Sequence, residues 1–459
     1  MHIEDTIAAI STPLGRSGIG IVRLSGKDAI RIADRIFISP KKKKLKQMPA
    51  HTILYGHIIM PLNKEVIDEV LVSLMKAPNT YTKEDIVEIN CHGGTVPLRR
   101  VLELVLNSGA RLAEPGEFTQ RAFLNGRIDL AQAEAVLDVI NALTDQGQKT
   151  AMTQLRGGLS KKLGTMREQL IELTAFVEAH IDFPEEDIES LSLKNMEKKA
   201  LRIRQSLKKL IDSSRYGMIL REGLKTAIIG RPNVGKSSLL NALLEHDRAI
   251  VTEMPGTTRD VIEEYLNING LPVKIMDTAG IRNVENIAEK EGVKRSLNAM
   301  EDADLVLLIL DGSSALQKTD IELIGKSNST NTIFVINKID LPQKINSKFK
   351  TQNSKFPVVS ISAKQGTGID ELKSKIVDTV LHGHIESNAD VVTNIRHVHA
   401  LEKALASINA FLTAVTNKTS PEFLSVELRD ALDAIGEIIG ITTPDDILNK
   451  IFSNFCIGK

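Results

Sequence analysis

Apolar and polar residues follow three different patterns along the 459-residue chain, and each pattern predicts a different kind of structure. Short apolar stretches bounded by turn residues occur in the first 125 residues and are typical of strands. They cover 19–24, 52–59, 69–75 and 86–91, and a stretch with helical spacing follows at 96–106. We therefore expect residues 1–125 to form an α+β domain.

Two later parts of the chain, 126–217 and 386–459, repeat apolar residues at intervals of three and four, the spacing of amphipathic helices. The repeated positions are Leu130, Ala133, Leu137 and Ile140; Leu163, Met166, Leu170, Leu173 and Val177; Met196, Ala200, Ile203, Leu207 and Leu210; Leu401, Leu405, Ile408 and Leu412; and Leu424, Leu428, Leu432 and Ile435. Neither set can bury its apolar stripe alone, so we expect both to share one core in a discontinuous all-α helical domain.

The segment between them, 218–385, carries continuous apolar runs separated by loops and helical stretches, as in a buried parallel sheet. The runs are 224–229, 273–276, 305–310, 332–336 and 357–361. The predicted fold class is therefore multidomain α/β, with an α/β domain inserted into the helical one.

The composition of the chain limits the compartment and the kinds of partner that we expect, but it does not indicate a function. Lys and Arg number 58, and so do Asp and Glu, which argues against a bulk basic field for nucleic acid but leaves room for a local patch. Cys91 and Cys456 form neither a disulfide framework nor a metal-type spacing. The N-terminus lacks a basic start followed by an apolar core, and the run 305–310 is too short for a bilayer. We expect a cytoplasmic protein without membrane association.

Two stretches of the N-terminal domain each allow two interpretations. Lys41–Lys44 with Lys46 is either a solvated loop or a contact for RNA. His92-Gly93-Gly94 is either a tight turn or a turn that holds an anion.

The inserted domain opens with a phosphate-binding loop. Gly230 is followed after four residues by Gly235, Lys236 and Ser237, between an apolar run and an amphipathic stretch. In this strand–loop–helix setting, glycines let backbone N–H groups surround a phosphate. Lys236 is predicted to contact the β- and γ-phosphates, and the Ser237 hydroxyl to bind Mg²⁺.

Three further motifs, each at the end of a predicted strand, indicate that the base is guanine. Asp340 in the segment 337–340 accepts from both N1–H and the 2-amino group of guanine, a donor pair that adenine lacks. Ser362-Ala363-Lys364 ends a second strand, and Asp277-Thr278-Ala279-Gly280 ends a third. Asp277 is expected in the Mg²⁺ shell and the Gly280 N–H at the γ-phosphate. The four motifs together predict a GTP-binding domain.

One residue departs from the common pattern of such domains. Ile281 follows Gly280, where many GTPases carry a glutamine that orients the attacking water. Either hydrolysis is slow, or another group does this work. Asn233 and the segment 252–258 offer oxygen ligands that could surround a monovalent cation and supply positive charge, although Asn233 is also a suitable loop-stabilising residue.

These motifs, with Gly256-Thr257-Thr258-Arg259-Asp260, resemble the potassium-activated GTPases of the TrmE-Era-EngA-like branch. The stretches 12–26 (TPLGRSGIGIVRLSG), 115–135 (PGEFTQRAFLNGRIDLAQAEA), 180–187 (HIDFPEED) and the terminal FCIGK resemble the MnmE (TrmE) family of tRNA modification GTPases over essentially the whole chain. The resemblance implies an N-terminal folate-binding domain at 1–125, a helical domain at 126–217 and 386–459, an inserted G domain at 218–385, and a homodimer built through the N-terminal domains.

The resemblance also implies roles for individual residues. Glu289 matches the glutamate that positions the hydrolytic water, and Cys456 the terminal cysteine invoked in modification. Arg127 replaces a lysine of a relative, which keeps the charge but changes the hydrogen-bond geometry. Potassium ligands are Asn233, Thr252, Met254 and Thr257; Mg²⁺ ligands are Ser237 and Thr258; folate contacts are Arg23, Glu88, Arg127 and Lys459. GTP contacts are Asn233, Val234, Gly235, Lys236, Ser237, Ser238, Thr252, Glu253, Met254, Pro255, Gly256, Thr257, Thr258, Asp277, Thr278, Ala279, Gly280, Asn337, Lys338, Asp340, Ser362, Ala363 and Lys364.

The activity implied is addition of an aminomethyl or carboxymethylaminomethyl group at C5 of the wobble uridine, position 34, of certain tRNAs. A 5-formyl- or 5,10-methylene-tetrahydrofolate would supply the carbon, and ammonium or glycine the nitrogen. A flavoprotein partner, MnmG (GidA), would bring FAD and NADH in a heterotetramer or larger complex.

Two other classes of protein share parts of this pattern. A ribosome-assembly GTPase would need an RNA-binding module such as a KH domain, and no GXXG-centred segment of that kind follows residue 385. A stand-alone folate-dependent one-carbon transferase would have no use for the GTPase motifs.

Overall fold

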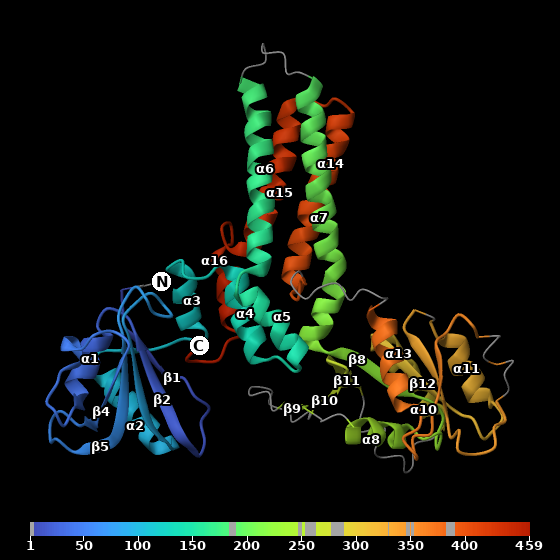
Figure 1. Cartoon of the computed structure of the whole chain (residues 1–459), viewed down its shortest axis with the longest axis horizontal. Helices are drawn as coiled ribbons and strands as arrows, with labels where there is room; N and C mark the ends of the chain where they lie inside the picture. The colour runs from blue at the N-terminus through green and yellow to red at the C-terminus, as the bar shows by residue number, and fades with distance from the viewer. Residues whose placement is uncertain are drawn as a thin grey trace. The chain divides into compact units, whose positions relative to one another are not determined.

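The structure, a computed structural model, describes residues 4–182, 190–246, 250–252, 263–276, 289–328, 330–345, 349, 353–381 and 391–459. Contacts within the chain separate two compact units, residues 1–137 with 436–459 and residues 138–435. Most of the helices and several strands of each unit are labelled in Figure 1. The predicted multidomain α/β fold class is confirmed, with an N-terminal sheet domain, a helical domain and an inserted α/β domain, here called the G domain after the resemblance above.

The first unit contains a seven-stranded sheet in the order β3-β4-β5-β6-β2-β1-β7. Neighbouring strands are antiparallel, except that β1 and β7 are parallel. The four predicted strands are present, and the structure adds three short ones. The strands are β1 (Ile7–Ile10), β2 (Ser17–Ser25), β3 (Phe37–Ile38), β4 (Thr52–Ile59), β5 (Val66–Met75), β6 (Ile86–Gly93) and β7 (Arg111–Leu112).

Strict alternation along the strands gives this sheet two different faces. Val22, Val72 and Val87 point to one face, where they share a core with α1 (Ala29–Ile36) and α2 (Thr95–Asn107). On the other face, Ile7 and Ala9 of β1 contact Phe118 of α3 (Glu117–Leu124). The remaining helices are the 3₁₀ turn η1 (Leu45–Gln47), α4 (Leu130–Ile140) and α16 (Asp445–Phe452).

The second unit begins with helices that bury their apolar stripes against one another. Figure 1 shows α6, α7, α14 and α15 running side by side. An ion pair between Arg429 and Glu178 joins α15 to α6, and Asn394 caps the N-terminus of α14. The helices are α5 (Asp145–Leu155), α6 (Gly158–Asp182), α7 (Ser190–Glu222), α14 (Ile395–Thr416) and α15 (Pro421–Ile439).

The G domain of this unit contains a second sheet, in the order β14-β13-β12-β8-β11-β10-β9. Strands β14, β13, β12, β8 and β11 are mutually parallel, so their carboxyl ends meet at one edge, where α/β sheets bind ligands. The elements are β8 (Leu224–Ile229), α8 (Lys236–His246), β9 (Ile250–Thr252), β10 (Glu263–Ile268), β11 (Leu271–Ile275), α10 (Glu289–Asp302), β12 (Leu305–Asp311), α11 (Lys318–Lys326), β13 (Thr332–Asn337), β14 (Val358–Ser360) and α13 (Ile369–Leu381).

No helix in the part of the chain that the structure describes is long and apolar enough to cross a membrane.

Candidate functional sites

The predicted phosphate loop connects the end of β8 to the start of α8. Three of its residues have positive φ, namely Gly230 at 146°, Asn233 at 63° and Gly235 at 100°. A side chain at Gly235 would collide with the amide nitrogen of Asn337, so this glycine is required for the approach of the base-binding motif. Ser237 and Ser238 follow in the first turn of α8, whose N-terminus faces the loop.

Lys236 lies beneath this loop. Its ammonium group donates to the carbonyl oxygens of Gly230, at 2.7 Å, and Arg231, at 3.0 Å. Burial lowers the pKa of Lys236 because it disfavours the charged form. A bound phosphate would counter that penalty, so the environment of this lysine suits an anionic ligand.

The predicted guanine-binding motifs are joined to the phosphate loop by direct hydrogen bonds. Asn337 Nδ2 donates to the Val234 carbonyl, at 2.8 Å, and Asn337 Oδ1 accepts from the Ala363 N–H, at 3.0 Å. Lys338 Nζ donates to the Asn233 carbonyl, at 2.8 Å. These hydrogen bonds join the three motifs into one cradle at the carboxyl edge of the sheet.

Asp340 is the exposed carboxylate of this cradle. The Ser362 hydroxyl donates to its Oδ1 at 2.6 Å, and this hydrogen bond, the largest cause, holds the pKa of Asp340 below its usual value. The group is therefore an ionised acceptor at neutral pH, as recognition of two guanine donors requires. Lys364 is exposed two residues after Ser362.

Asp311 was missed at the sequence level. It ends β12, and its Oδ2 accepts from Lys338 Nζ at 2.8 Å. Burial alone would raise the pKa of Asp311, but hydrogen bonds from Lys338 and Ser313 outweigh it and lower the pKa. An acidic residue directly after a buried run was the signal, because Asp277 and Asp340 occupy similar positions.

Several predicted GTP-site residues cannot be compared with the structure. Glu253–Thr258 and Asp277–Gly280 lie outside the described residues. For Thr252 and Glu289 the structure describes the backbone alone, which belongs to β9 and α10. The part of the donor set that is described fits a nucleotide with Mg²⁺: a half-buried cation, loop amides at a helix N-terminus and the Ser237 position.

A second candidate site lies in the first unit, on the face of the sheet that α3 covers. Arg23 of β2 and Glu88 of β6 are directly opposite in the strand register, and Arg23 Nε donates to Glu88 Oε1 at 2.7 Å. Beside this pair is a cavity of about 190 Å³. It is lined by Arg23, Met75, Tyr81, Ile86, Glu88, Val136 and Lys459.

The C-terminal tail completes this site from the other end of the sequence. Arg23 Nη1 donates to the Gly458 carbonyl, at 3.1 Å, and the Phe118 N–H donates to the main-chain oxygen of Lys459, at 3.2 Å. Gly458 has a φ of 94°, and a side chain there would meet the Ile10 carbonyl. Exposed Cys456 lies three residues before Lys459.

Part of the cavity lining suits a reduced folate. Met75, Tyr81 and Ile86 offer walls for a ring system, Glu88 an acceptor for ring N–H groups, and Lys459 a cation for carboxylates. Its volume is below the roughly 300–1,000 Å³ of pockets that enclose a whole drug-sized ligand, so it fits one end of a folate. Arg127 does not line it; its guanidinium stacks over the Tyr81 ring, 4.7 Å from the centroid.

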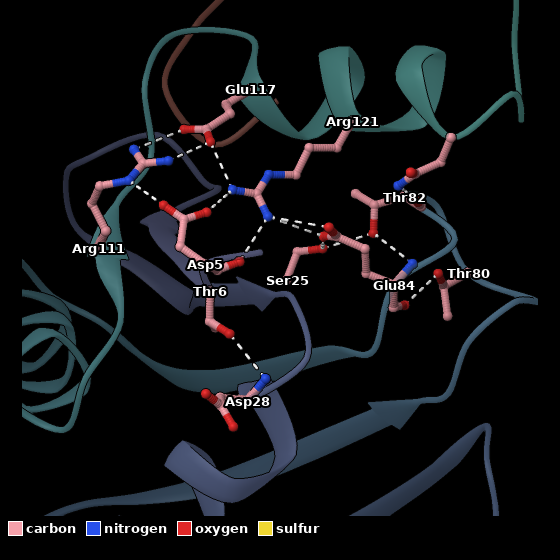
Figure 2. A network of polar contacts seen from close by, with 11 residues as sticks. Asp5, Thr6, Ser25, Asp28, Thr80, Thr82, Glu84, Arg111, Glu117 and Arg121 are labelled. Carbon is pink, nitrogen blue, oxygen red and sulfur yellow. Dashed lines mark hydrogen bonds and ion pairs between the residues drawn. The ribbon is translucent and has the colours of Figure 1, made fainter. Parts of the chain in front are cut away.

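Helix α3, which holds the tail, is itself fixed by a network of charges that the sequence did not reveal (Figure 2). The buried guanidinium of Arg121 donates to Asp5 at 2.5 Å, to Glu117 at 2.9 Å and to Glu84 at 3.1 Å. Arg111 adds bonds to Asp5 and Glu117, both at 2.6 Å. The network joins α3 to the chain before β1 and to the loop before β6.

Comparison with known proteins gives matches over the whole chain. A family model described as the MnmE helical domain matches residues 130–456, a range that includes the inserted domain, and one described as the GTP-binding protein TrmE N-terminus matches residues 6–127.

Curated relatives match at full length. Proteins named tRNA modification GTPase MnmE from Alkaliphilus oremlandii (strain OhILAs) and Thermoanaerobacter pseudethanolicus (strain ATCC 33223 / 39E) are 50% and 51% identical, and one from Clostridioides difficile (strain 630) is 49% identical. Each alignment covers 100% of both chains. Among solved structures, the G domain of the T. maritima FeoB iron transporter is 29% identical over 34% of this chain and 98% of that chain, with a TM-score of 0.25.

Proposed function

Because the chain belongs to the MnmE family of tRNA modification GTPases, we propose that it adds an aminomethyl or carboxymethylaminomethyl group at C5 of the wobble uridine, position 34, of its tRNA substrates. Family membership makes the chain a GTPase that acts in tRNA modification, with Mg²⁺ as the metal of its nucleotide site. The chemistry at the uridine, the one-carbon source and the partner are the proposed part.

For GTP hydrolysis, we propose a role for each of several residues in and around the cradle. Lys236 binds the β- and γ-phosphates, Asp340 selects guanine, and Ser237 with Thr258 holds Mg²⁺. Bound Mg²⁺ supplies positive charge to the phosphates. Asn233, with Thr252, Met254 and Thr257, is proposed to bind K⁺. The exposure of Asn233 and its positive φ, at the edge of the loop, support that role. Glu289 is proposed to orient the attacking water, because Ile281 stands where many GTPases carry a glutamine for that purpose.

The modification half of the proposal rests on one observation: Arg23, Glu88 and Lys459, which are far apart in the sequence, line a single cavity. Exposed Cys456 lies three residues before Lys459. A tetrahydrofolate bound there would supply the one-carbon unit. Glu88 would accept from ring N–H groups, and Arg23 and Lys459 would bind the carboxylates of the glutamate tail. Arg127 would contact the part of the ligand outside the cavity, above Tyr81.

Assembly completes the proposal. We place the protein in the cytoplasm, as a homodimer through its N-terminal sheets, with MnmG (GidA) supplying FAD and NADH in a heterotetramer or larger complex. The face of the first sheet that points away from α1 and α2 supports such an interface. Ile53 and Tyr55 of β4 and Leu71 of the neighbouring β5, with Ile19 of β2, are between 45% and 67% exposed, which is unusual for a free surface.

The test uses the Cys456→Ser variant. We expect it to hydrolyse GTP at the wild-type rate but to leave wobble uridine unmodified, as measured by nucleoside analysis of tRNA from a strain lacking the wild-type chain. Cys91→Ala is the matched control, because burial, the largest cause, raises the pKa of the Cys91 thiol to about 12 and removes it from thiolate chemistry.

The outcomes separate the rival functions. Full modification with Cys456→Ser would reduce that thiol to a packing role. Normal wobble nucleosides in the strain without any copy of the chain would favour a ribosome-assembly GTPase. Modification by the purified chain without a flavoprotein would favour a lone transferase.

A further inference from the structure

Five lysines lie among the six residues Lys41–Lys46 and take no part in the function proposed above. All five are exposed, and Leu45 between them is fully buried. Within the residues that the structure describes, no acidic side chain forms an ion pair with any of them. Their charge is therefore available to a partner from outside the chain.

The segment is an ordered turn with its ends fixed. The Lys42 N–H donates to the Ser39 carbonyl at 2.8 Å, and Asp34 accepts from the N–H groups of Leu45, at 2.6 Å, and Lys46, at 3.2 Å. The Asp34 carboxylate is thus occupied by backbone amides of the turn. A fixed backbone lowers the entropy cost of ordering the lysine side chains around a ligand.

Further cations connect this turn to the cavity of the first unit. Lys76 Nζ donates to the Lys46 carbonyl at 3.3 Å, and Lys76 directly follows Met75 of the cavity wall. Next to Tyr81 of the same wall are Lys83, which donates to the Gly126 carbonyl at 3.0 Å, and Arg127. Lys76 therefore adds one cation beside the lysine turn, and Lys83 and Arg127 add two near the cavity wall.

We propose that Lys41–Lys44, Lys46 and Lys76, here named the lysine surface, bind the phosphate backbone of the substrate tRNA. Closely spaced phosphates are the ligand that several adjacent lysines match, and lysine contacts of this kind give affinity without reading sequence. The net charge of the whole chain is zero, so this local excess is the feature that would orient a polyanion. The proposal rests on tRNA as substrate and adds where its backbone is held.

The test is a salt series. Full-length chain with GDP is titrated with a tRNA transcript that has uridine at the wobble position, between about 50 and 200 mM salt. The variant is the quadruple change Lys41→Gln, Lys43→Gln, Lys44→Gln and Lys46→Gln. We expect affinity at low salt to fall by roughly tenfold or more, and the slope of log K against log salt to decrease by about one unit for each phosphate that the variant no longer binds.

The matched control removes four of the exposed lysines of α7, as Lys194→Gln, Lys198→Gln, Lys208→Gln and Lys209→Gln. We expect its affinity to stay within about twofold of wild type. An unchanged slope in the first variant, or an equal fall in affinity in the control, would overturn the proposal. The proposal would also be overturned if Lys41–Lys46 were needed for binding to vesicles of anionic phospholipid but not for binding to tRNA.

A second readout separates this inference from the proposed chemistry. With the lysine surface removed, modification should recover at high tRNA concentration, because the variant is impaired in KM, and GTP hydrolysis without tRNA should be unchanged. If the wild-type chain restores no wobble modification, the proposed chemistry fails whatever the tRNA affinities are.

Discussion

At the scale of single residues, the proposed guanine selection depends on one carboxylate that accepts a hydrogen bond from one hydroxyl. Asp340 accepts from Ser362 at 2.6 Å and is exposed beside the cradle. Changing Asp340→Asn replaces an acceptor with a group that also donates, which suits the 2-oxo group of xanthine. We expect preference to move from GTP towards XTP by roughly ten- to a hundredfold, since a hydrogen bond to a charged group is worth about 1.5–3 kcal/mol.

The measurement is competition between GTP and XTP for binding to the full chain. Asp304→Asn is the matched control: Asp304 is an exposed aspartate at the opposite end of β12, where it accepts from the Lys225 N–H at 3.0 Å. Unchanged selectivity in Asp340→Asn would remove the assignment of this residue to the base.

Where the nucleotide motifs lie could be predicted from sequence because each motif is local. Short patterns at the ends of apolar runs were enough to place Lys236 and Asp340 at the carboxyl edge of the sheet, and their roles stay predictions. What local patterns cannot give is which distant residues meet. Asp311 was missed although Lys338 binds it, and Tyr81 was missed although it lines the same cavity as Arg23.

At the scale of elements, α3 depends on a buried guanidinium. Arg121 is 2% exposed and binds three carboxylates, of which Glu117 is equally buried (Figure 2). Arg121→Met would leave these carboxylates without their main cation, and breaking a buried pair in this way costs about 3–5 kcal/mol. We expect a decrease of that size in the free energy of unfolding, measured by chemical denaturation. Arg111→Met should cost less, because the Arg111 side chain is 42% exposed.

The same network predicts how acid acts on this part of the chain. Burial alone would raise the pKa of Asp5 and of Glu117, but hydrogen bonds from Arg111 and Arg121 outweigh burial and lower both. A carboxylate whose pKa is lowered by folding stabilises the fold fully when the pH is above its unfolded-state pKa, which is near 3.8 for Asp5 and 4.5 for Glu117. That stabilisation is lost as the pH falls through the lower pKa of the folded state. The decrease of stability in acid should therefore be smaller in Arg121→Met than in wild type; equal pH profiles would contradict this explanation.

Elements differed in how well the sequence predicted them. The long helices and the buried strands of the G domain were predicted because apolar spacing repeats over many residues. Strands β3 and β7 have two residues each, too few for a period, and form because they pair with β4 and β1. The contact between α3 and the C-terminal tail is a tertiary contact, which the spacing of apolar residues in the sequence does not predict.

At the scale of the whole molecule, the chain passes between helical and G domains at two places within residues 138–435. It enters through α7, whose last turns place Ile219 and Leu220 in the G-domain core, and it returns through 391–394 to α14. Gly217 allows close contact between them, because a side chain there would collide with the Val392 carbonyl. The entry and the exit are therefore joined to each other.

Buried polar groups hold that joint. Thr393 Oγ1 lies 3.3 Å from Asp138 Oδ2 and 3.2 Å from Gln154 Oε1, and Gln154 Nε2 donates to the Val391 carbonyl at 2.7 Å. Arg221 at the end of α7 pairs with the same Asp138, at 2.9 Å. A change in the G domain that moves α7 must move this network, so the network can pass nucleotide state to the helices.

Thr393→Val tests that connection, because it keeps the shape of the side chain and removes its hydroxyl. We expect GTP hydrolysis to continue near the wild-type rate while the number of GTP molecules hydrolysed per modified tRNA rises, by roughly two- to thirtyfold for a decrease in coupling of about 0.5–2 kcal/mol. Thr153→Val is the control, since its hydroxyl donates to the Lys149 carbonyl within α5. An unchanged ratio in Thr393→Val would mean that the helices receive nucleotide state by another route.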